Sequence, residues 1–258
     1  MADKSLIKLE SVIIMKVNAF IQARMSSSRL PGKVLTNIVD KPMLQHIVER
    51  LKNAKMIDEV VVLTSNEHSD DAISTFCDTH HIACFRGSLN DVLNRFYMAS
   101  QMYPADHIVR ITADCPLVDS ELVDNIVAKH LAAKADFTSN CHPAMYPDGL
   151  DVEVMKASAL HSAQSQADTA HQREHVTPFL FTHQEQFLCI NYDAPTELPL
   201  LRLTVDHPED LTLIKKIYSA LYPLDTNFNL QKTLNLLAEN PTWLDDNKQF
   251  SRNEATQV

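Results

Sequence analysis

The chain has 258 residues, of which 45% are hydrophobic, and 33 acidic residues against 23 basic ones give a formal net charge of −10. This composition is typical of a globular protein and excludes wholesale disorder. No run of about 18 apolar residues predicts a membrane span, and the first sixteen residues lack the pattern of a secretory signal. The acidic balance disfavours general nucleic-acid binding, so a phosphorylated ligand would need a local basic pocket.

Five cysteines are scattered along the chain, and none belongs to a CxxC pair. An odd number with this spacing argues against a disulfide framework and against a thiolate zinc site. The twelve histidines show no HExxH spacing either. These features predict a reduced, cytoplasmic setting.

Short β-rich runs alternate with helical patterns through the first half of the chain. Strands are predicted at residues 17–22, 59–64, 82–85 and 107–112. Helices are predicted over 42–54 and after N-terminal caps at Ser69, Ser88 and Ser120. Strands joined by helices at this spacing predict right-handed βαβ crossovers and a largely parallel sheet.

The rhythm changes after about residue 136. Further strands, some of them antiparallel, are predicted at residues 136–140, 150–155, 187–192 and 201–205. Two helices are predicted near 208–221 and 228–238, and the residues after Asp245 read as a polar, frayed tail. The chain is therefore predicted to comprise an N-terminal arm (1–14), a single domain (15–245) and a C-terminal tail (246–258).

The loop after the first strand concentrates basic and hydroxyl side chains. Residues 23–33 read ARMSSSRLPGK, with Arg24, Arg29 and Lys33 around three serines. A triphosphate requires hydroxyl and backbone donors together with fixed cations, and ligands of open α/β sheets bind at the carboxyl ends of the strands. The sequence is not a Walker A loop. The alternative is a solvated basic loop, but its place at a strand end in an acidic protein favours phosphate binding.

Two aspartates also follow predicted strands. Asp114 comes after HIVRIT and Asp206 after LRLTV, so both carboxylates are expected to face one crevice. Mg²⁺ prefers a few carboxylates together with waters and phosphate oxygens. The alternative for Asp206 is capping of the helix that begins near Pro208.

Other polar groups allow two interpretations. Arg86 and Ser88 stand at a predicted helix start, where an anion or a base edge could bind, but Arg86 could equally form a structural ion pair. Asp91 and Arg95 lie four residues apart and could pair with each other. Arg110 lies within a strand, where structural pairing competes with ligand contact. Cys115 reads as a small buried filler rather than a nucleophile.

A series of motifs gives a more specific signal. IQARMSSSRLPGKVL, FRGSLNDVLNRF, VRITADCPLVD, TSN, PDGLDVEV, REHVTPF and LTVDHPEDL occur in this order between residues 17 and 220. Together they resemble the SpsF-type cytidylyltransferases of spore-coat polysaccharide biosynthesis, which are related to the acylneuraminate and 3-deoxy-manno-octulosonate cytidylyltransferases. The chain departs from the family where Ser26 and Ala113 replace glycine.

The resemblance implies a fold, a reaction and a set of residues. The fold would be a Rossmann-like three-layer αβα arrangement with a mixed, mostly parallel sheet. The enzyme would join CTP to an acidic or modified sugar, with Mg²⁺ as cofactor, release pyrophosphate and act as a homodimer. Residues 135–200 would form the acceptor-sugar and dimerisation region.

By this resemblance the catalytic residues would be Arg24, Lys33 and Asp114, and the metal would lie on Asp114 and Asp206. Nucleotide binding would fall to Ala23, Arg24, Ser26, Ser28, Arg29, Lys33, Arg86, Ser88 and Asp114. The acceptor would contact Asp148, Asp151, Glu153, Arg173, Glu174 and His175, although His175 could also be a satisfied core histidine.

Two other functions compete with this one. A glycosyltransferase on a similar sheet would need a DxD-like metal element, and TADCP offers one carboxylate only. A non-catalytic nucleotide-binding scaffold would be favoured by the missing glycines, because serine and alanine resist positive φ. The series of motifs favours the transferase over both, since the sheet architecture alone hosts many chemistries.

Overall fold

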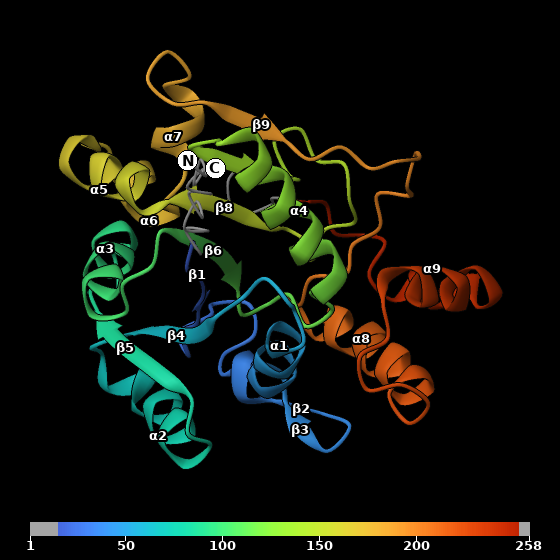
Figure 1. Cartoon of the computed structure of the whole chain (residues 1–258). Helices are drawn as coiled ribbons and strands as arrows, with labels where there is room; N and C mark the ends of the chain where they lie inside the picture. The colour runs from blue at the N-terminus through green and yellow to red at the C-terminus, as the bar shows by residue number, and fades with distance from the viewer. Residues whose placement is uncertain (1–14, 253–258) are drawn as a thin grey trace, which may run out of the picture.

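Within residues 15–252, which the computed structural model describes, a seven-stranded sheet forms the centre of the molecule (Figure 1), in the order β5-β4-β1-β6-β8-β7-β9. Its parallel half contains β1 (Val17–Gln22), β4 (Glu59–Ser65), β5 (Ala83–Gly87) and β6 (His107–Thr112). The other half contains β7 (Phe137–Ser139), β8 (Glu153–Lys156) and β9 (Cys189–Asn191), and β8 is antiparallel to both neighbours. The predicted mixed, mostly parallel sheet is confirmed.

Helices cover both faces of the sheet and complete three layers (Figure 1). One face packs against α1 (Met43–Lys52), α2 (Asp71–Thr79), α4 (Ser120–Ala133) and α8 (Pro208–Leu221). The opposite face packs against α3 (Val92–Met102), α5 (Ala157–Gln166) and α7 (Pro178–Thr182). The short helix α6 (Ala170–His175) contacts α3, and α9 (Leu230–Glu239) contacts α8. A small hairpin joins β2 (Asn37–Ile38) to β3 (Lys41–Pro42).

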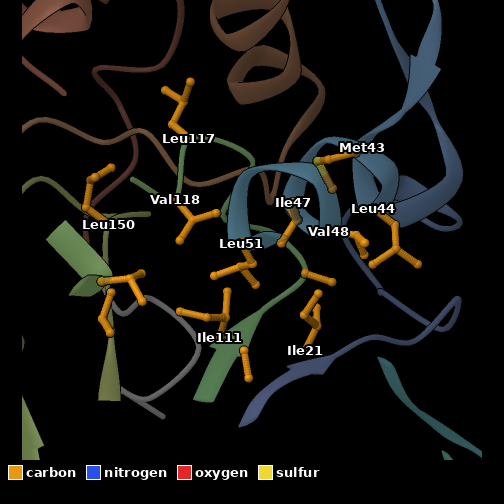
Figure 2. Close-up of a cluster of buried hydrophobic side chains, with 14 of the residues drawn as sticks. Ile21, Met43, Leu44, Ile47, Val48, Leu51, Ile111, Leu117, Val118 and Leu150 are labelled. Carbon is orange, nitrogen blue, oxygen red and sulfur yellow. The ribbon is translucent and has the colours of Figure 1, made fainter. Parts of the chain in front are cut away.

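Two apolar clusters hold the layers together because successive strand residues point to opposite faces. In β1, Ile21 belongs to the cluster under α1, whereas its neighbour Phe20 packs against Phe96 of α3, with ring centroids 5.9 Å apart. Figure 2 shows the first cluster, in which Ile47 and Leu51 of α1 point toward β1 and β6. The helix predicted over 42–54 is thus confirmed as α1, and each fully buried side chain of this size contributes about 1.5–3 kcal/mol.

Two helices begin at carboxylates rather than at the predicted serines. Asp91 caps α3, accepting a hydrogen bond from the amide of Asn94 at 3.0 Å, and the Ser88 hydroxyl instead accepts from the amide of Asp91. Asp119 caps α4 one residue before the predicted Ser120. A carboxylate is the stronger acceptor for the partly positive end of a helix.

The predicted cap at Ser69 lies inside a 3₁₀ turn (His68–Asp70), and α2 starts at Asp71.

The second half of the chain departs further from the sequence pattern. The strand predicted at 150–155 is β8, shifted toward the C-terminus, and helices α5, α6 and α7 were not predicted. The segment 201–205 is not a strand in the described part of the chain; it forms a single bridge between Arg202 and Asp148. Its apolar residues Leu203 and Val205 are buried because they pack into the core, without a hydrogen-bonded ladder.

The C-terminal segment 247–252 packs against the domain instead of fraying. Asn247 is buried and donates hydrogen bonds to the Arg202 carbonyl and to Asp210, at 3.0 and 2.9 Å. The ring of Phe250 stacks on His207 with centroids 3.8 Å apart. The polar composition of this segment therefore reflects specific hydrogen bonds.

The predicted arm, residues 1–14, and the last six residues of the predicted tail lie outside the described residues. Among the helices of residues 15–252, none combines the length and the apolar character that crossing a bilayer requires.

Candidate active site

Lys33 lies between the two predicted metal-binding aspartates. It begins a 3₁₀ turn (Lys33–Leu35), and its Nζ lies 3.2 Å from Asp114 Oδ2 and 2.9 Å from Asp206 Oδ1. The same ammonium group donates to the Val205 carbonyl at 2.7 Å. These residues are brought together at the carboxyl ends of β1 and β6, where ligands of α/β sheets bind.

Mutual attraction favours the charged forms of Lys33 and Asp114. Burial alone would lower the pKa of Lys33, but attraction to Asp114 and Asp206 outweighs it and raises that pKa. Burial would raise the pKa of Asp114, and the charge of Lys33 with hydrogen bonds from Thr112 and Lys33 brings it below its usual value. Arg29 adds a second cation, 2.8 Å from Asp206.

The donor set of this cluster suits a hard divalent cation. Asp114, Asp206 and the Val205 carbonyl already converge with oxygen atoms on one positive charge. The N-cap of α8 is His207, with Pro208 as the first helical residue, so the alternative in which Asp206 caps the helix is wrong. Its carboxylate instead contacts Lys33, Arg29 and Arg202.

The basic loop folds back through a glycine. Gly32 has φ +71°, the left-handed region that glycine tolerates best, and its amide donates to the Met25 carbonyl at 3.0 Å. The Met25 amide in turn donates to Asp70 at 2.7 Å. Among residues 15–252 the non-glycine residues with positive φ do not include Ser26 or Ala113. The loop therefore accommodates Ser26, and the end of β6 accommodates Ala113, without a positive φ at either position. The loop exposes Arg24, Ser26 and Ser28.

Arg86 has a structural role. Its guanidinium donates to the carbonyls of Ser65 and Glu67 at 2.8 and 2.9 Å and pairs with Asp71 at 2.7 Å. These contacts fasten β5 to the segment between β4 and α2. The ion-pair alternative is the one that the structure shows, and the Ser88 hydroxyl is likewise used inside its own loop.

Arg173 and Glu174 lie away from the cavity described below. Arg173 donates to both oxygens of Asp91, at 3.0 and 2.5 Å, and to Gln164, so it links α6 to the start of α3. The predicted pairing of Asp91 with Arg95 is therefore wrong, because Arg95 donates to the Ser88 carbonyl. Glu174 is exposed.

A cavity of about 410 Å³ extends from this cluster toward β8. It brings together the predicted residues Arg29, Asp114, Asp148, Asp151, Glu153, His175 and Asp206. It also contains groups to which the sequence analysis gave no role in acceptor binding: Arg110, Cys141, His142, Thr177, Phe181 and Arg252. His175 thus lines a cavity rather than the core, and its ring contacts that of His171, with centroids 4.5 Å apart.

Glu153 and Arg110 form a buried ion pair between β8 and β6. Burial would raise the pKa of Glu153, but attraction to Arg110, the nearby His142 ring and a hydrogen bond from Thr177 lower it to about 2. Thr177 donates to the Glu153 carboxylate at 2.7 Å. The pair is therefore a fixed part of the cavity wall.

Asp148 and Asp151 lie close to each other in the cavity, in addition to the pair of Asp114 and Asp206. Arg252 binds the Asp151 carboxylate and donates to the Tyr146 carbonyl at 2.9 Å. Asp148 has a cation at 3.5 Å, the Arg202 guanidinium. Burial and then repulsion from Asp151 raise the pKa of Asp148 to about 6.

The sequence analysis did not identify Arg252 as a site residue because it interpreted the polar terminal segment as frayed. Phe250, an aromatic residue two positions earlier, could have indicated that the segment packs against the domain.

Cys115 also lines the cavity, where its thiolate form is disfavoured. Burial and then the charge of Asp114 raise the pKa of its thiol well above the ordinary value, so the reactive thiolate is disfavoured. This agrees with the interpretation of Cys115 as a filler.

The sheet between two layers of helices is typical of the α/β nucleotidyltransferase fold, and the cation–carboxylate cluster lies at the strand ends where such folds bind ligands. A solved cytidylyltransferase from Leptospira borgpetersenii superposes with a TM-score of 0.85 at 34% identity, covering 92% of this chain and all of the other. A CMP:2-keto-3-deoxy-manno-octonic acid synthetase complexed with CTP shares the fold, with a TM-score of 0.60 at 18% identity over 79% of this chain and 98% of that one.

The chain belongs to the cytidylyltransferase family. The family model described as cytidylyltransferase matches residues 18–246. The spore coat polysaccharide biosynthesis protein SpsF of Bacillus subtilis is 34% identical over 205 residues, which cover 77% of this chain and 84% of that protein. The resemblance inferred from the motifs is therefore confirmed, and the protein is a nucleotidyltransferase.

Proposed function

We propose that this cytidylyltransferase joins CTP to a hydroxyl group of a sugar, giving a CMP-sugar and pyrophosphate with Mg²⁺ as cofactor. The observation that carries the proposal is the continuous cavity from the Lys33–Asp114–Asp206 cluster to the polar pocket around Asp148 and Asp151. Two similar proteins support it, because one is named for polysaccharide biosynthesis and the other for CMP-sugar synthesis with CTP bound.

Positioning and charge neutralisation do most of the work in such a transfer. Arg24, Arg29 and Lys33 neutralise the triphosphate, which the exposed hydroxyl residues Ser26 and Ser28 contact, whereas the side chain of Ala23 is buried in the core. Asp114 and Asp206 would hold Mg²⁺, which supplies charge neutralisation at the phosphate oxygens when bound. Since Lys33 now pairs with both carboxylates, its ammonium group moves to a phosphate when the nucleotide binds.

The pocket beyond the cluster receives the acceptor. Asp148, Asp151 and Glu153 offer carboxylate oxygens, and His175 lies on the same wall. Arg86, Ser88, Arg173 and Glu174 are not included, because the first three hold protein contacts and the last lies away from the cavity.

The scaffold alternative loses its main support. Its argument was the absence of two glycines, and Ser26 and Ala113 both adopt ordinary backbone angles. No feature of the site favours the glycosyltransferase. The homodimer remains a proposal that rests on the resemblance, and the cytoplasmic location remains one that rests on the number and spacing of the cysteines.

Pyrophosphate release tests the function. With Mg²⁺ and a panel of sugars, we expect sugar-dependent release with CTP and much less with ATP, GTP or UTP. Asp114→Asn should lower the rate by about 100-fold or more, the scale of losing a group that stabilises developing charge. The control Asp168→Asn changes an exposed carboxylate outside the cavity and should leave the rate unchanged. Release without a sugar, or undiminished release by Asp114→Asn, contradicts the proposal.

A further inference from the structure

Three potential metal ligands of different chemistry converge on the wall of the cavity, outside the cluster around Lys33. Cys141, His142 and Glu153 each offer one atom, respectively a thiol sulfur, an imidazole nitrogen and a carboxylate oxygen. These three atoms all lie within 4.8 Å of one another. All three residues line the cavity, so a cation that they bind can also bind water from it.

The pairing of β7 with β8 brings these ligands together. Ser139 of β7 lies opposite Glu153 of β8, and Cys141 and His142 follow in the next turn. The buried Asn140 side chain makes hydrogen bonds of 2.8 and 2.9 Å to the backbone that precedes β8. Two ligands therefore come from one turn, which is fastened to the strand that carries the third.

The Glu153 carboxylate is already oriented for a cation. Arg110 binds its Oε2 atom, and Thr177 donates to Oε1 at 2.7 Å. The same Oε1 lies 3.7 Å from Nε2 of His142, whose ring stacks on Phe181 with centroids 4.1 Å apart. A carboxylate oxygen has two lone pairs, so Oε1 keeps one for a cation while it accepts from Thr177. Carboxylates that bind metals are commonly held by outer hydrogen bonds of this kind.

The spacing of the ligands is close to the spacing around a tetrahedral Zn²⁺ ion. Bonds of about 2.0–2.1 Å to nitrogen and oxygen and about 2.3 Å to sulfur keep the ligand atoms roughly 3.3–3.6 Å apart. The separation of 3.7 Å between the imidazole and the carboxylate is near this range. The thiol lies at most about one ångström beyond it, and Cys141 is only partly buried, so its side chain can close the gap. A thiolate and an imidazole suit Zn²⁺, whereas Mg²⁺ prefers oxygen ligands.

We propose that Cys141, His142 and Glu153 bind a divalent cation of the thiolate-preferring class, such as Zn²⁺. This site is separate from the one proposed for Mg²⁺ on Asp114 and Asp206. The thiol releases its proton to solvent on binding, and a water molecule from the cavity completes the coordination. The spacing of the cysteines argues against a zinc site built from several thiolates, and this site uses one thiolate that the fold places beside two other ligands.

Cobalt tests the thiolate ligand directly. Co²⁺ occupies tetrahedral zinc sites, and a thiolate bound to it gives a charge-transfer band in the near ultraviolet that nitrogen and oxygen ligands do not give. We expect this band in the wild type, its loss when stoichiometric Zn²⁺ is added, and no effect of excess Mg²⁺. Cys141→Ser should abolish the band and weaken Zn²⁺ binding in calorimetry about 100-fold or more, because the loss of even an outer partner of a ligand costs about 10–100-fold.

Cys115→Ser is the matched control, because Cys115 is the other thiol that lines the described cavity. This variant should keep the band and the Zn²⁺ affinity. His142→Gln changes an exposed residue and should weaken Zn²⁺ binding, which keeps the test valid if Cys141→Ser does not fold. The absence of the band in the wild type overturns the inference. So does a band that is lost in Cys115→Ser and retained in Cys141→Ser.

The cation and the acceptor share one end of the cavity, because Glu153 is also proposed to face the sugar. This consequence rests on the proposed sugar-transfer function, whereas the cobalt spectrum needs neither CTP nor sugar. With saturating Mg²⁺ and CTP, free Zn²⁺ at about ten times its dissociation constant should raise KM for the sugar roughly tenfold by mass action. Cys141→Ser should remove this effect. Equal inhibition of both proteins contradicts the competition, and a lack of sugar-dependent release contradicts the proposed function but not the metal site.

Discussion

At the scale of single residues, the position of Lys33 matters most. Its ammonium group occupies the space between Asp114 and Asp206, where the metal is proposed to bind. The positive charge that stabilises the two carboxylates without ligand is therefore the group that must leave when metal and nucleotide arrive. The metal then replaces the ammonium group of Lys33 between Asp114 and Asp206, so neither carboxylate is left without a positive partner.

Replacing Lys33 with methionine should make the protein depend on the metal. Lys33→Met leaves both carboxylates without this partner, and we expect the free energy of unfolding to fall by about 3–5 kcal/mol. Added Mg²⁺ should restore part of this loss, so the stabilisation by Mg²⁺ in urea unfolding should be larger in the variant than in the wild type. The control Lys248→Met removes an exposed lysine and should show neither effect. An equal Mg²⁺ effect in Lys33→Met and wild type would argue against the metal site.

The Asp148 carboxylate should lower the free energy of unfolding as the pH rises. Its pKa is raised from 3.8 to about 6, so the folded protein holds a proton that the unfolded chain releases, and stability falls as the pH rises between these values. Asp148→Asn removes that cost. We expect the variant to be more stable by up to about 3 kcal/mol at pH 8 and by little at pH 4, measured by urea unfolding. A variant that is less stable than wild type at pH 8 would contradict the buried, repelled carboxylate.

At the scale of elements, the C-terminal segment 247–252 completes the cavity in which the acceptor is proposed to bind. Phe250 stacks on His207, next to the Asp206 carboxylate, and two residues later Arg252 enters the cavity. The stacking fixes the segment, and the segment fixes the guanidinium that binds Asp151. Phe250 therefore positions Arg252 in the proposed acceptor site.

Loss of the Phe250 ring should weaken acceptor binding without affecting the nucleotide. We expect Phe250→Ala to raise KM for the sugar about tenfold, the scale of a lost aromatic contact of about 1 kcal/mol or slightly more. The value of kcat and the dissociation constant for CTP should change little, and Phe250→Tyr should restore KM. Lys248→Ala, in the same segment, is the control. A parallel loss of CTP affinity would show that the segment supports the whole site instead.

At the scale of the whole molecule, a basic loop stands out in a chain of net charge −10. Arg24, Arg29 and Lys33 are concentrated at one end of the sheet, and Mg²⁺ would reduce the charge of the triphosphate further. Nucleotide binding should therefore depend on the metal, because an acidic body repels a bare triphosphate.

Thermal unfolding with ligands tests this dependence. With Mg²⁺, CTP at about 100 times its dissociation constant should stabilise the fold by about 2.7 kcal/mol, seen as a rise in Tm. At the same concentration ATP, GTP and UTP should stabilise less, and chelation with EDTA should remove most of the CTP effect. Asp114→Asn should lose the Mg²⁺-dependent part. Equal stabilisation by all four nucleotides would contradict the proposed preference for cytosine.

Local sequence patterns determined most of the parallel half of the fold. The boundaries of β1, β6 and α8 agree with prediction. The reason is that the pattern of apolar residues that identifies each of these elements lies within its own residues. The position of Asp114 at a strand end could be predicted for the same reason. Residues 201–205 show the limit of this signal, since a run of buried apolar residues does not distinguish a strand from an extended segment without a ladder.

Only the tertiary structure decided the partners of the charged side chains. Lys33 meets Asp206 across 173 positions of sequence, and Arg252 meets Asp151 across 101. Arg173 and Arg86, both predicted to bind ligands, instead meet protein acceptors brought near by the packing of α6 and α2. The sequence by itself determined the strands, the family motifs and the types of group in the site. Which cation neutralises which carboxylate depends on distances between elements, and those distances exist only once the layers have packed.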